Sequence, residues 1–585
     1  MTHMKKGNIE VHTQNIFPVI KKWLYSDKDI FLRELVVNGC DAITKLKKLS
    51  SIGEAQIGEE ELKLNVDCDK DAKTITITDN GIGMTAEEVE KYITQVAFSG
   101  AEEFLKKYET ENEENRIIGH FGLGFYSAFM VADTVEIETK SYKDEPAVKW
   151  TCDGGTEYEM TECDKADRGT KITLHVSETE EDFLEQFKLK SILLKYCGFL
   201  PYPIYMNDEK EPVNDTAPLW TRNPSECTEE QYKELYHRVF SDMNDPLFWI
   251  HLNVEYPFAL KGILYFPKLT HEFESAEGQI KLYNNQVFVA DNIKEVIPEF
   301  LMLLKGIIDC PELPLNVSRS FLQNDGYVSK ISAHITKKVA DKLISLHKNE
   351  KEQFDSYYED IAPFIEYGCL RDEKFYDKLK PCLQAKNLDG KYTGIIKYGE
   401  DNDKKITYVS DPKLQIQYIK ILKEKKQDAL VMPHLIDTHF ISFLEMKEGF
   451  KFTRIDATPE NADTESDIVK MFTDILGSDT LKVSAASLKT NVPAIISEDE
   501  QTRRMSDITK MFGTGFNAPK TYTLIINTDS PLVSKVAEVS DEETKKDICK
   551  QIYDIARICH SPLEVDELSA FIERSTSLLE RLADK

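Results

Sequence analysis

The sequence lacks the features that mark a secreted, metal-held or membrane-spanning chain. Its 11 cysteines are scattered and form no Cys-x-x-Cys pair. A disulfide framework or a zinc ribbon uses paired cysteines at regular spacing, so we expect reduced thiols in a cytoplasmic protein. Residues 1–10 contain no apolar segment of the kind found in a signal peptide. No apolar stretch approaches the length of a membrane span.

Basic residues are also few relative to acidic ones. The chain has 73 Lys and Arg against 102 Asp and Glu, which gives a formal net charge of -29. A polyanion repels nucleic acid and anionic membranes, so we expect neither as a partner, and the acidity otherwise favours solubility. His434 and His439 do not share a helix face well and predict no metal site between them.

The chain is long enough for several domains, and 41% of its residues are hydrophobic. A polar stretch at 207–218 (NDEKEPVNDTAP) is typical of a linker, and the composition shifts again at 457–465 (ATPENADTE). We therefore predict an α+β protein divided into residues 1–206, a short linker at 207–218, residues 219–457 and residues 458–585.

Hydrophobic periodicity predicts the individual elements. Residues 62–68 and 73–78 alternate apolar and polar side chains and predict two strands joined by a hairpin. Helices are expected at 17–25, 29–50 and 329–349, and further strands at 134–139, 147–151, 171–176, 262–266 and 286–290. Two amphipathic helices are expected at 542–560 and 565–583. Their apolar stripes can be buried internally or against a partner, and the stripes alone favour internal packing.

The helix at 29–50 carries a polar stripe. Glu34, Asn38 and Asp41 stand at i, i+4 and i+7, so they share one face, and apolar rows flank that face on both sides. A cleft-facing carboxylate beside an amide can orient a water molecule and hold a hydrated Mg²⁺. Taken alone, the pattern is explained better by an ordinary helix face with a capping Asp.

Three further motifs follow in the same region. Residues 79–84 (DNGIGM) come directly after a strand, and their glycines allow a sharp turn and close approach of a flat ligand. Residues 119–125 (GHFGLGF) form a glycine-rich turn before a helical run at 126–132, where free N–H groups can meet phosphate. Neither a P-loop nor a G-x-G-x-x-G fingerprint is present there. Residues 168–170 (RGT) enter a strand.

In this order the four motifs resemble the nucleotide site of the GHKL ATPase superfamily. The wider strings are similar to the heat-shock protein 90 family, and they lie at 30–35 (IFLREL), 118–133 (IGHFGLGFYSAFMVAD), 168–172 (RGTKI), 220–224 (WTRNP) and 313–319 (LPLNVSR). The resemblance implies an N-terminal Bergerat-type α/β sandwich ATPase domain with a lid, an α/β middle domain and a mainly helical C-terminal dimerisation domain. It implies a cytoplasmic, ATP-dependent chaperone that uses ATP and Mg²⁺, forms a homodimer and remodels non-native client proteins. Other chaperones are a further class of partner that it allows.

The resemblance also assigns roles. Glu34 would be the general base, Asn38 would hold Mg²⁺, and Asp79 would accept the adenine amine. Arg319, assisted by Gln323, would reach the γ-phosphate from the middle domain, although a structural salt bridge is its alternative role. The implied nucleotide-binding residues are Asn38, Asp41, Asp79, Gly83, Met84, Ser99, Gly100, Gly119, Phe121, Gly122, Gly124, Phe125 and Thr170. Trp220 is a candidate client contact if it is exposed.

Departures from the family pattern bear on nucleotide affinity and lid kinetics. The family usually has Ser-Asn-Ala-Ser-Asp where residues 37–41 read VNGCD, and Lys-Ser-Gly-Thr where residues 98–101 read FSGA, so that Phe98 and Ala101 replace the lysine and threonine. His120 stands where a glutamine is usual.

Three other function classes compete with the chaperone ATPase. A nucleic-acid enzyme of the superfamily needs basic grooves, which the acidic balance disfavours. A histidine kinase needs a phospho-accepting histidine in a dimerising helix before the ATP site, and His3 and His12 precede the site without one. A scaffold that binds ATP without turnover stays open. The short linker and the final residues LADK favour the bacterial members of the family, without docking of helper proteins through a Glu-Glu-Val-Asp tail.

Overall fold

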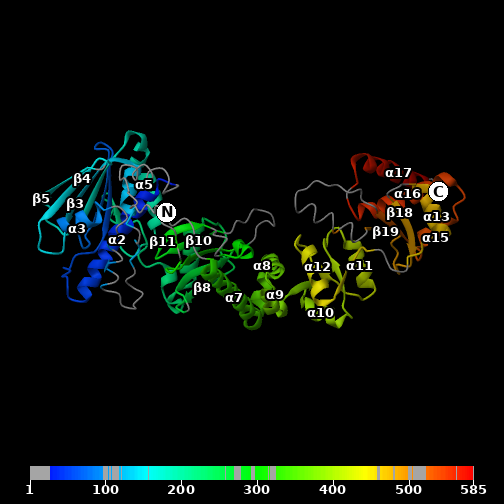
Figure 1. The fold of residues 1–585 in the computed structure, drawn as a ribbon. Coiled ribbons are helices and arrows are strands. Elements are labelled where there is room, and N and C mark those ends of the chain that lie inside the picture. The colour runs from blue at the N-terminus through cyan, green and yellow to red at the C-terminus, as the bar shows by residue number, and fades with distance from the viewer. Residues whose placement is uncertain are drawn as a thin grey trace, which may run out of the picture. The chain divides into compact units, whose positions relative to one another are not determined.

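The chain divides into two compact units, which are drawn in Figure 1 and described separately below. The first consists of residues 1–268 and 275–335, and the second of residues 269–274 and 336–585. The computed structural model describes residues 27–95, 100, 103–104, 107, 117–119, 122–155, 157–256, 258–268, 279–291, 297–313, 315, 325–457, 462–477, 481–498, 504, 522–561 and 563–583.

The first unit begins with a seven-stranded sheet. Its strands are β5 (Tyr158–Cys163), β4 (Ala147–Cys152), β3 (Ala132–Lys140), β6 (Gly169–Val176), β2 (Thr74–Asp79), β1 (Leu64–Asp69) and β7 (Ile204–Met206), in that order across the sheet. All neighbours are antiparallel except β1 and β7, which are parallel. The predicted hairpin at 62–78 is confirmed as β1 and β2.

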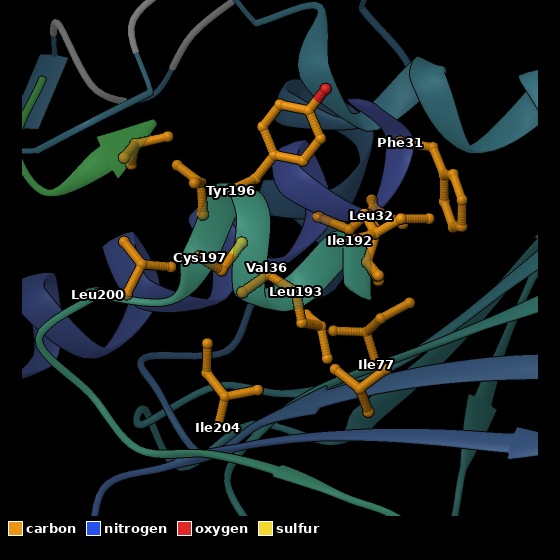
Figure 2. Close-up of a cluster of buried hydrophobic side chains, with 14 of the residues drawn as sticks. Phe31, Leu32, Val36, Ile77, Ile192, Leu193, Tyr196, Cys197, Leu200 and Ile204 are labelled. Carbon is orange, nitrogen blue, oxygen red and sulfur yellow. The ribbon is translucent and has the colours of Figure 1, made fainter. Parts of the chain in front are cut away.

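Two helices cover one face of this sheet. They are α2 (Ile30–Ser51) and α5 (Gln186–Cys197), which pack on each other. Figure 2 shows their apolar side chains meeting those of the sheet, with Val36 of α2 and Leu193 of α5 directed toward Ile77 of β2. Because β2 buries alternate residues, its other face keeps Thr74, Thr76 and Thr78 half-buried. The apolar side of β2, with Ile75 and Ile77, therefore faces the core.

The same unit contains a second sheet. Its five strands are β11 (Val287–Asp291), β10 (Ile280–Asn284), β12 (Lys305–Asp309), β9 (Leu260–Phe266) and β8 (Phe248–Val254). Aromatic side chains join the two sheets in one core: Tyr196 contacts Phe288 with ring centroids 5.9 Å apart, and Phe199 contacts Trp220 at 4.5 Å. Trp220 is fully buried, so the expectation that it contacts clients from the surface is wrong.

Several 3₁₀-helices and short α-helices connect the strands of these two sheets. They are α3 (Ala86–Tyr92), η4 (Gly124–Met130), η5 (Glu178–Leu184), η6 (Leu219–Thr221), η7 (Pro224–Glu226), α6 (Glu229–Phe240) and η8 (Glu299–Leu303), after which α7 (Asp325–Asn349) follows in the chain. The helical run expected at 126–132 is a 3₁₀-helix that ends before β3. The helix predicted at 17–25 lies outside the described residues.

The second unit holds two more sheets. One has the order β14 (Tyr392–Gly394), β13 (Gln384–Asn387), β16 (Leu430–Val431), β15 (Lys405–Val409) and β17 (Lys451–Arg454); the other has β18 (Leu481–Ala486), β20 (Tyr522–Asn527) and β19 (Ala494–Glu498). The helices are α8 (Lys351–Arg371), α9 (Glu373–Leu379), η9 (Lys380–Cys382), α10 (Ile395–Asp401), α11 (Ile416–Glu424), α12 (Asp437–Glu448), α13 (Asp467–Leu476), α15 (Pro531–Ala537), α16 (Glu542–Ile558) and α17 (Val565–Ala583). The α+β class is thus confirmed.

The two terminal helices differ in how they are packed. The helix α16 buries Cys549, Ile552 and Ala556 against the three-stranded sheet, whereas α17 has no buried residue. Leu579 of α17 is 66% exposed and Leu582 is 69% exposed. Among the described residues, no helix is both long enough and apolar enough to cross a membrane.

Candidate functional site

A cavity of about 460 Å³ lies in the first unit between α2 and the seven-stranded sheet. Its walls come from α2, the turn after β2, α3 and the strands β3 and β6, and from the described residues Gly100, Glu103, Phe104, Lys107, Gly119, Gly122, Gly124 and Phe125. The capping box between Thr85 and Glu88 fixes the start of α3 at this cavity. The four sequence motifs therefore meet around one space.

The polar stripe of α2 faces this cavity, as its spacing predicts. Glu34, Asn38 and Asp41 all line it, Glu34 and Asp41 being buried and Asn38 half-buried. Arg33, itself buried, donates from Nε (3.0 Å) and Nη2 (2.7 Å) to Oε1 of Glu34. Two charge-assisted hydrogen bonds to one oxygen hold the carboxylate in one orientation, so Glu34 is a fixed acid group rather than a mobile surface one.

The Asp41 carboxylate holds the glycine segment against α2. Its Oδ1 accepts the Ile118 N–H at 2.8 Å, and its Oδ2 accepts the Gly119 N–H at 2.7 Å. A side chain on Gly119 would meet this carboxylate at 3.0 Å. The sequence placed Asp41 among the nucleotide ligands, and the structure adds this bracing role.

Asp79 is the buried carboxyl at the sheet side of the cavity. Desolvation raises its pKa from 3.8 to about 7, although hydrogen bonds from the Gly81 and Thr170 backbone N–H groups oppose the shift. The Gly81 N–H donates to Oδ1 at 2.8 Å. An acid group buried in this way without a salt bridge costs folding free energy, which is typical of functional sites.

A row of threonines continues from Asp79 across the sheet. Asp79 pairs with Thr170 on β6, and Thr170 pairs with Thr139 on β3. The two threonine Oγ1 atoms are 3.0 Å apart, and the Met84 N–H donates to Thr139 at 3.0 Å. Sequence analysis missed Thr139 because only the strand register places it beside Thr170.

The turn after β2 requires glycine. Gly83 has φ +62°, and a Cβ there would stand 1.8 Å from the Lys140 carbonyl oxygen. Arg168 fixes the same turn by donating from Nε to the Gly81 carbonyl at 3.0 Å. The backbone can therefore approach a flat ligand closely, as the motif predicted.

The described part of the glycine segment borders the acidic end of the cavity. A Cβ on Gly124 would stand 2.5 Å from Oε2 of Glu34, and Gly122 has φ +64°. The Phe125 ring packs edge-to-face on Trp150, with centroids 5.8 Å apart. Gly119, Gly122, Gly124 and Phe125 therefore all line the cavity.

Lys45 is a cavity residue that sequence analysis did not select. It lies one turn beyond Asp41 and lines the cavity; burial lowers its pKa, while Asp41 and Glu88 oppose that shift. The sequence could have identified Lys45, because it follows Asp41 by four residues and so shares the helix face of Glu34, Asn38 and Asp41.

Of the other residues predicted for the site, Gly100 also lines the cavity. Ser99, Phe121, Arg319 and Gln323 lie outside the described residues, as do Phe98, Ala101 and His120.

Comparisons with known proteins agree with this geometry. Residues 28–171 match the model of the histidine kinase-, DNA gyrase B- and HSP90-like ATPase family, and residues 206–584 match that of the Hsp90 protein family.

Similar curated proteins include "Chaperone protein htpG" of Bacteroides fragilis, 44% identical over 92% of this chain and 85% of that protein. "Chaperone protein HtpG" of Porphyromonas gingivalis is 43% identical over 95% and 87%, and that of Fusobacterium nucleatum is 31% identical over 92% of each. The family match over residues 206–584 and these relatives show that the chain belongs to the heat-shock protein 90 family of chaperones.

Proposed function

We propose that this chain is an ATP-driven chaperone that binds and hydrolyses ATP in the cavity beside α2 and acts on non-native proteins as a cytoplasmic homodimer. The observation that carries the proposal is the convergence of a fixed acid, an amide and a buried carboxyl on one cavity of about 460 Å³. Family membership supports the same activity.

The adenine base is assigned to the Asp79 side of the cavity. An ionised Asp79 accepts a hydrogen bond from the exocyclic amine, and the carboxylate is desolvated, which strengthens that bond. Thr170, the Gly83 backbone and Met84 complete this end, with Thr139 holding the Met84 N–H. A base that offers no donor here would leave the buried carboxylate unpaired.

The hydrolytic end is assigned to Glu34 and Asn38. Arg33 fixes one oxygen of Glu34, and the other lies toward Gly124, where it can take a proton from an attacking water. Asn38 suits a hydrated Mg²⁺ because a half-buried amide oxygen beside two carboxylates is a hard-oxygen donor set. When bound, Mg²⁺ supplies neutralisation of phosphate charge.

Each proposed domain has its own part in the ATP-driven conformational cycle of the chaperone. Residues 1–206 form the nucleotide domain with its lid, 207–218 the linker, 219–457 the middle domain that contributes Arg319, and 458–585 the dimerisation domain. The exposed apolar stripe of α17 supports dimerisation, since Val565, Leu579 and Leu582 are each more than 60% exposed and contiguous exposed apolar side chains mark interaction surfaces.

Steady-state ATP hydrolysis by the full chain, followed with suppression of aggregation of an unfolded test protein, tests the proposal. We expect turnover that a competitive ligand of the nucleotide cavity abolishes, together with ATP-dependent protection of the test protein. ATP binding without turnover would instead assign the chain as a nucleotide-binding scaffold, the alternative that the lid departures leave open.

A further inference from the structure

The turn after β2 is held from outside the cavity by the segment that leads into β6. This turn carries Asp79 and Gly83, so its conformation sets the geometry of one end of the cavity. Arg168 is the residue directly before β6, its side chain is 17% exposed, and it is not among the residues that line the cavity. Arg168 can therefore act on a ligand only through the turn.

The guanidinium of Arg168 contacts two consecutive carbonyl groups of the turn. Its Nε donates to the Gly81 carbonyl at 3.0 Å, and its Nη2 donates to the Asn80 carbonyl at 3.2 Å. A guanidinium presents its N–H donors in one rigid plane, whereas a lysine ammonium is a compact charge on a flexible stem. The two bonds therefore restrict the path of the backbone between Asp79 and Gly83.

The next two residues contact the same turn through the backbone. Gly169 has φ +115°, and a Cβ there would stand 2.1 Å from the Asp79 carbonyl oxygen. Thr170 is the strand partner of Asp79, and its backbone N–H is hydrogen-bonded to the Asp79 carboxyl group. Residues 168–170 thus contact the turn one after another, and of these three only Thr170 lines the cavity.

An ion pair at the surface is the simpler explanation for Arg168. Its Nη2 also pairs with Oε1 of Glu60, whose side chain is 50% exposed. An ion pair with such an exposed partner contributes little to stability. The bonds to the turn differ from it, because they reach a backbone in which Gly81 is buried. The two explanations predict different effects on ligand binding.

Arg168 also places a positive charge near the Asp79 carboxyl. Desolvation raises the pKa of Asp79, and the charges of Lys165 and Arg168 lower it. The Cys40 thiol of α2 is a further titratable group near this carboxyl. Lys165 acts through its charge, since its Nζ donates to the Asp167 carbonyl at 2.7 Å. Substituting the two cations separately therefore distinguishes an effect of charge from an effect of position.

We propose that Arg168 is a positioning residue for nucleotide binding, which holds the turn at 79–83 in the conformation that receives the base. The proposal rests on the assignment of adenine to Asp79 under the proposed function, and it adds a residue outside the cavity to those that determine affinity. Two quantities separate its effects. The affinity for adenosine when Asp79 is fully ionised reports the position of the turn, and the pH midpoint of binding reports the charge around Asp79.

Calorimetry of adenosine binding to the full chain, at pH values on both sides of about 7, tests the proposal. We expect Arg168→Met to lower the affinity at high pH by at least about tenfold, because misplaced binding groups are costly, and to raise the pH midpoint. Arg168→Lys keeps the charge but not the paired carbonyl contacts, so it should lower the affinity and leave the midpoint near that of the wild type.

Two control variants complete the series. Lys165→Met should raise the midpoint and keep the wild-type affinity at high pH, and Glu60→Gln should also keep that affinity. If the wild type binds adenosine and Arg168→Met binds it equally well at high pH, the inference is wrong and the proposed function stands. An equal loss in Glu60→Gln and Arg168→Met would assign the effect to the surface ion pair and also overturn the inference.

A wild type that does not bind adenosine would overturn both the inference and the proposed function. Circular dichroism and thermal unfolding of each variant show whether it is folded. Should Arg168→Met fail to fold, Arg168→Lys against Lys165→Met gives the same comparison, since only the first of these two should lose affinity at high pH.

Discussion

The buried carboxyl of Asp79 affects both the stability of the fold and the binding of a ligand. Its pKa in the folded chain is about 7 against 3.8 ordinarily. A raised carboxyl pKa means that the folded state keeps the proton longer than the unfolded state. Stability from this group is complete below pH 3.8 and is lost as the pH rises through about 7. At and above neutral pH the buried carboxylate therefore destabilises the fold, and a ligand that donates a hydrogen bond to it offsets that cost.

Asp79→Asn should abolish nucleotide binding while keeping the fold. The amide oxygen can still accept the Gly81 N–H, but the amide nitrogen opposes the adenine amine. We expect a loss of affinity of more than about 100-fold, measured by calorimetry. The variant should also melt above the wild type at neutral pH, since it carries no buried charge. Unchanged affinity would exclude the proposed role.

Adenosine affinity should depend on pH in a defined direction. The base donates to ionised Asp79, so affinity should be constant well above pH 7 and should fall as the pH drops through about 7, by up to about tenfold per pH unit. Adenosine is the suitable probe because it carries no phosphate that titrates near neutrality. A flat binding profile across neutral pH would contradict the assignment.

Glu34→Ala should separate binding from hydrolysis. A general base contributes about 10²–10⁴-fold to the rate, and we expect turnover to fall within that range while ATP affinity changes little. Measuring single-turnover hydrolysis with the protein in excess over ATP, at a protein concentration that binds all of the ATP, isolates the chemical step. Normal turnover in this variant would leave Glu34 with a structural role beside Arg33.

Much of the site could be predicted from residue type and spacing. The stripe of α2 and the glycines after β2 follow from local chemistry, and both line the cavity. Thr139 and the bracing of Ile118 by Asp41 could not be predicted, because they depend on strand register and on a contact between segments distant in the chain.

At the scale of elements, hydrophobic periodicity predicted where helices and strands lie better than it predicted which kind of helix forms. The strands β1 and β2 match their expected ranges within a few residues, because each buries alternate side chains, and α2 matches its expected range although it is buried on most sides. The run after Gly124 is a 3₁₀-helix, since β3 begins immediately after it and leaves no room for further turns. The parallel pairing of β7 with β1 is a tertiary feature that no local pattern contains.

The apolar stripes of the terminal helices α16 and α17 differ in burial, although internal packing and contact with a partner were possible for both. The first is packed internally, and the second leaves its stripe exposed. We predict that Leu579→Glu weakens the dimer. Burying a leucine contributes roughly 2 kcal/mol, and a two-fold interface loses it twice, so the dimer Kd should rise about 1000-fold. Analytical ultracentrifugation measures this rise. Met446→Glu, at a 76% exposed position on α12, is the control that should remain dimeric.

For the whole molecule, the position of the domain boundary matters to any fragment experiment. Tyr196 and Phe199 pack on Phe288 and Trp220, so a chain cut at residue 206 would expose an apolar surface. A fragment of residues 1–349 avoids this, because it keeps the first unit together with the whole of α7. It also retains the cavity and Arg319, but it lacks the proposed dimerisation domain.

We predict that this 1–349 fragment binds ATP as tightly as the full chain but hydrolyses it at least about tenfold more slowly at low concentration. A tether raises the effective concentration of two nucleotide domains for each other to about millimolar, whereas free fragments must meet by diffusion. Turnover per fragment should therefore increase with fragment concentration, while turnover per full-length chain should not. The comparison requires rates over a wide dilution series, with ATP affinity measured on the same samples. A fragment that hydrolyses ATP at the full-length rate at high dilution would show that each nucleotide domain acts alone, and the role of α17 would then be limited to holding clients between two chains.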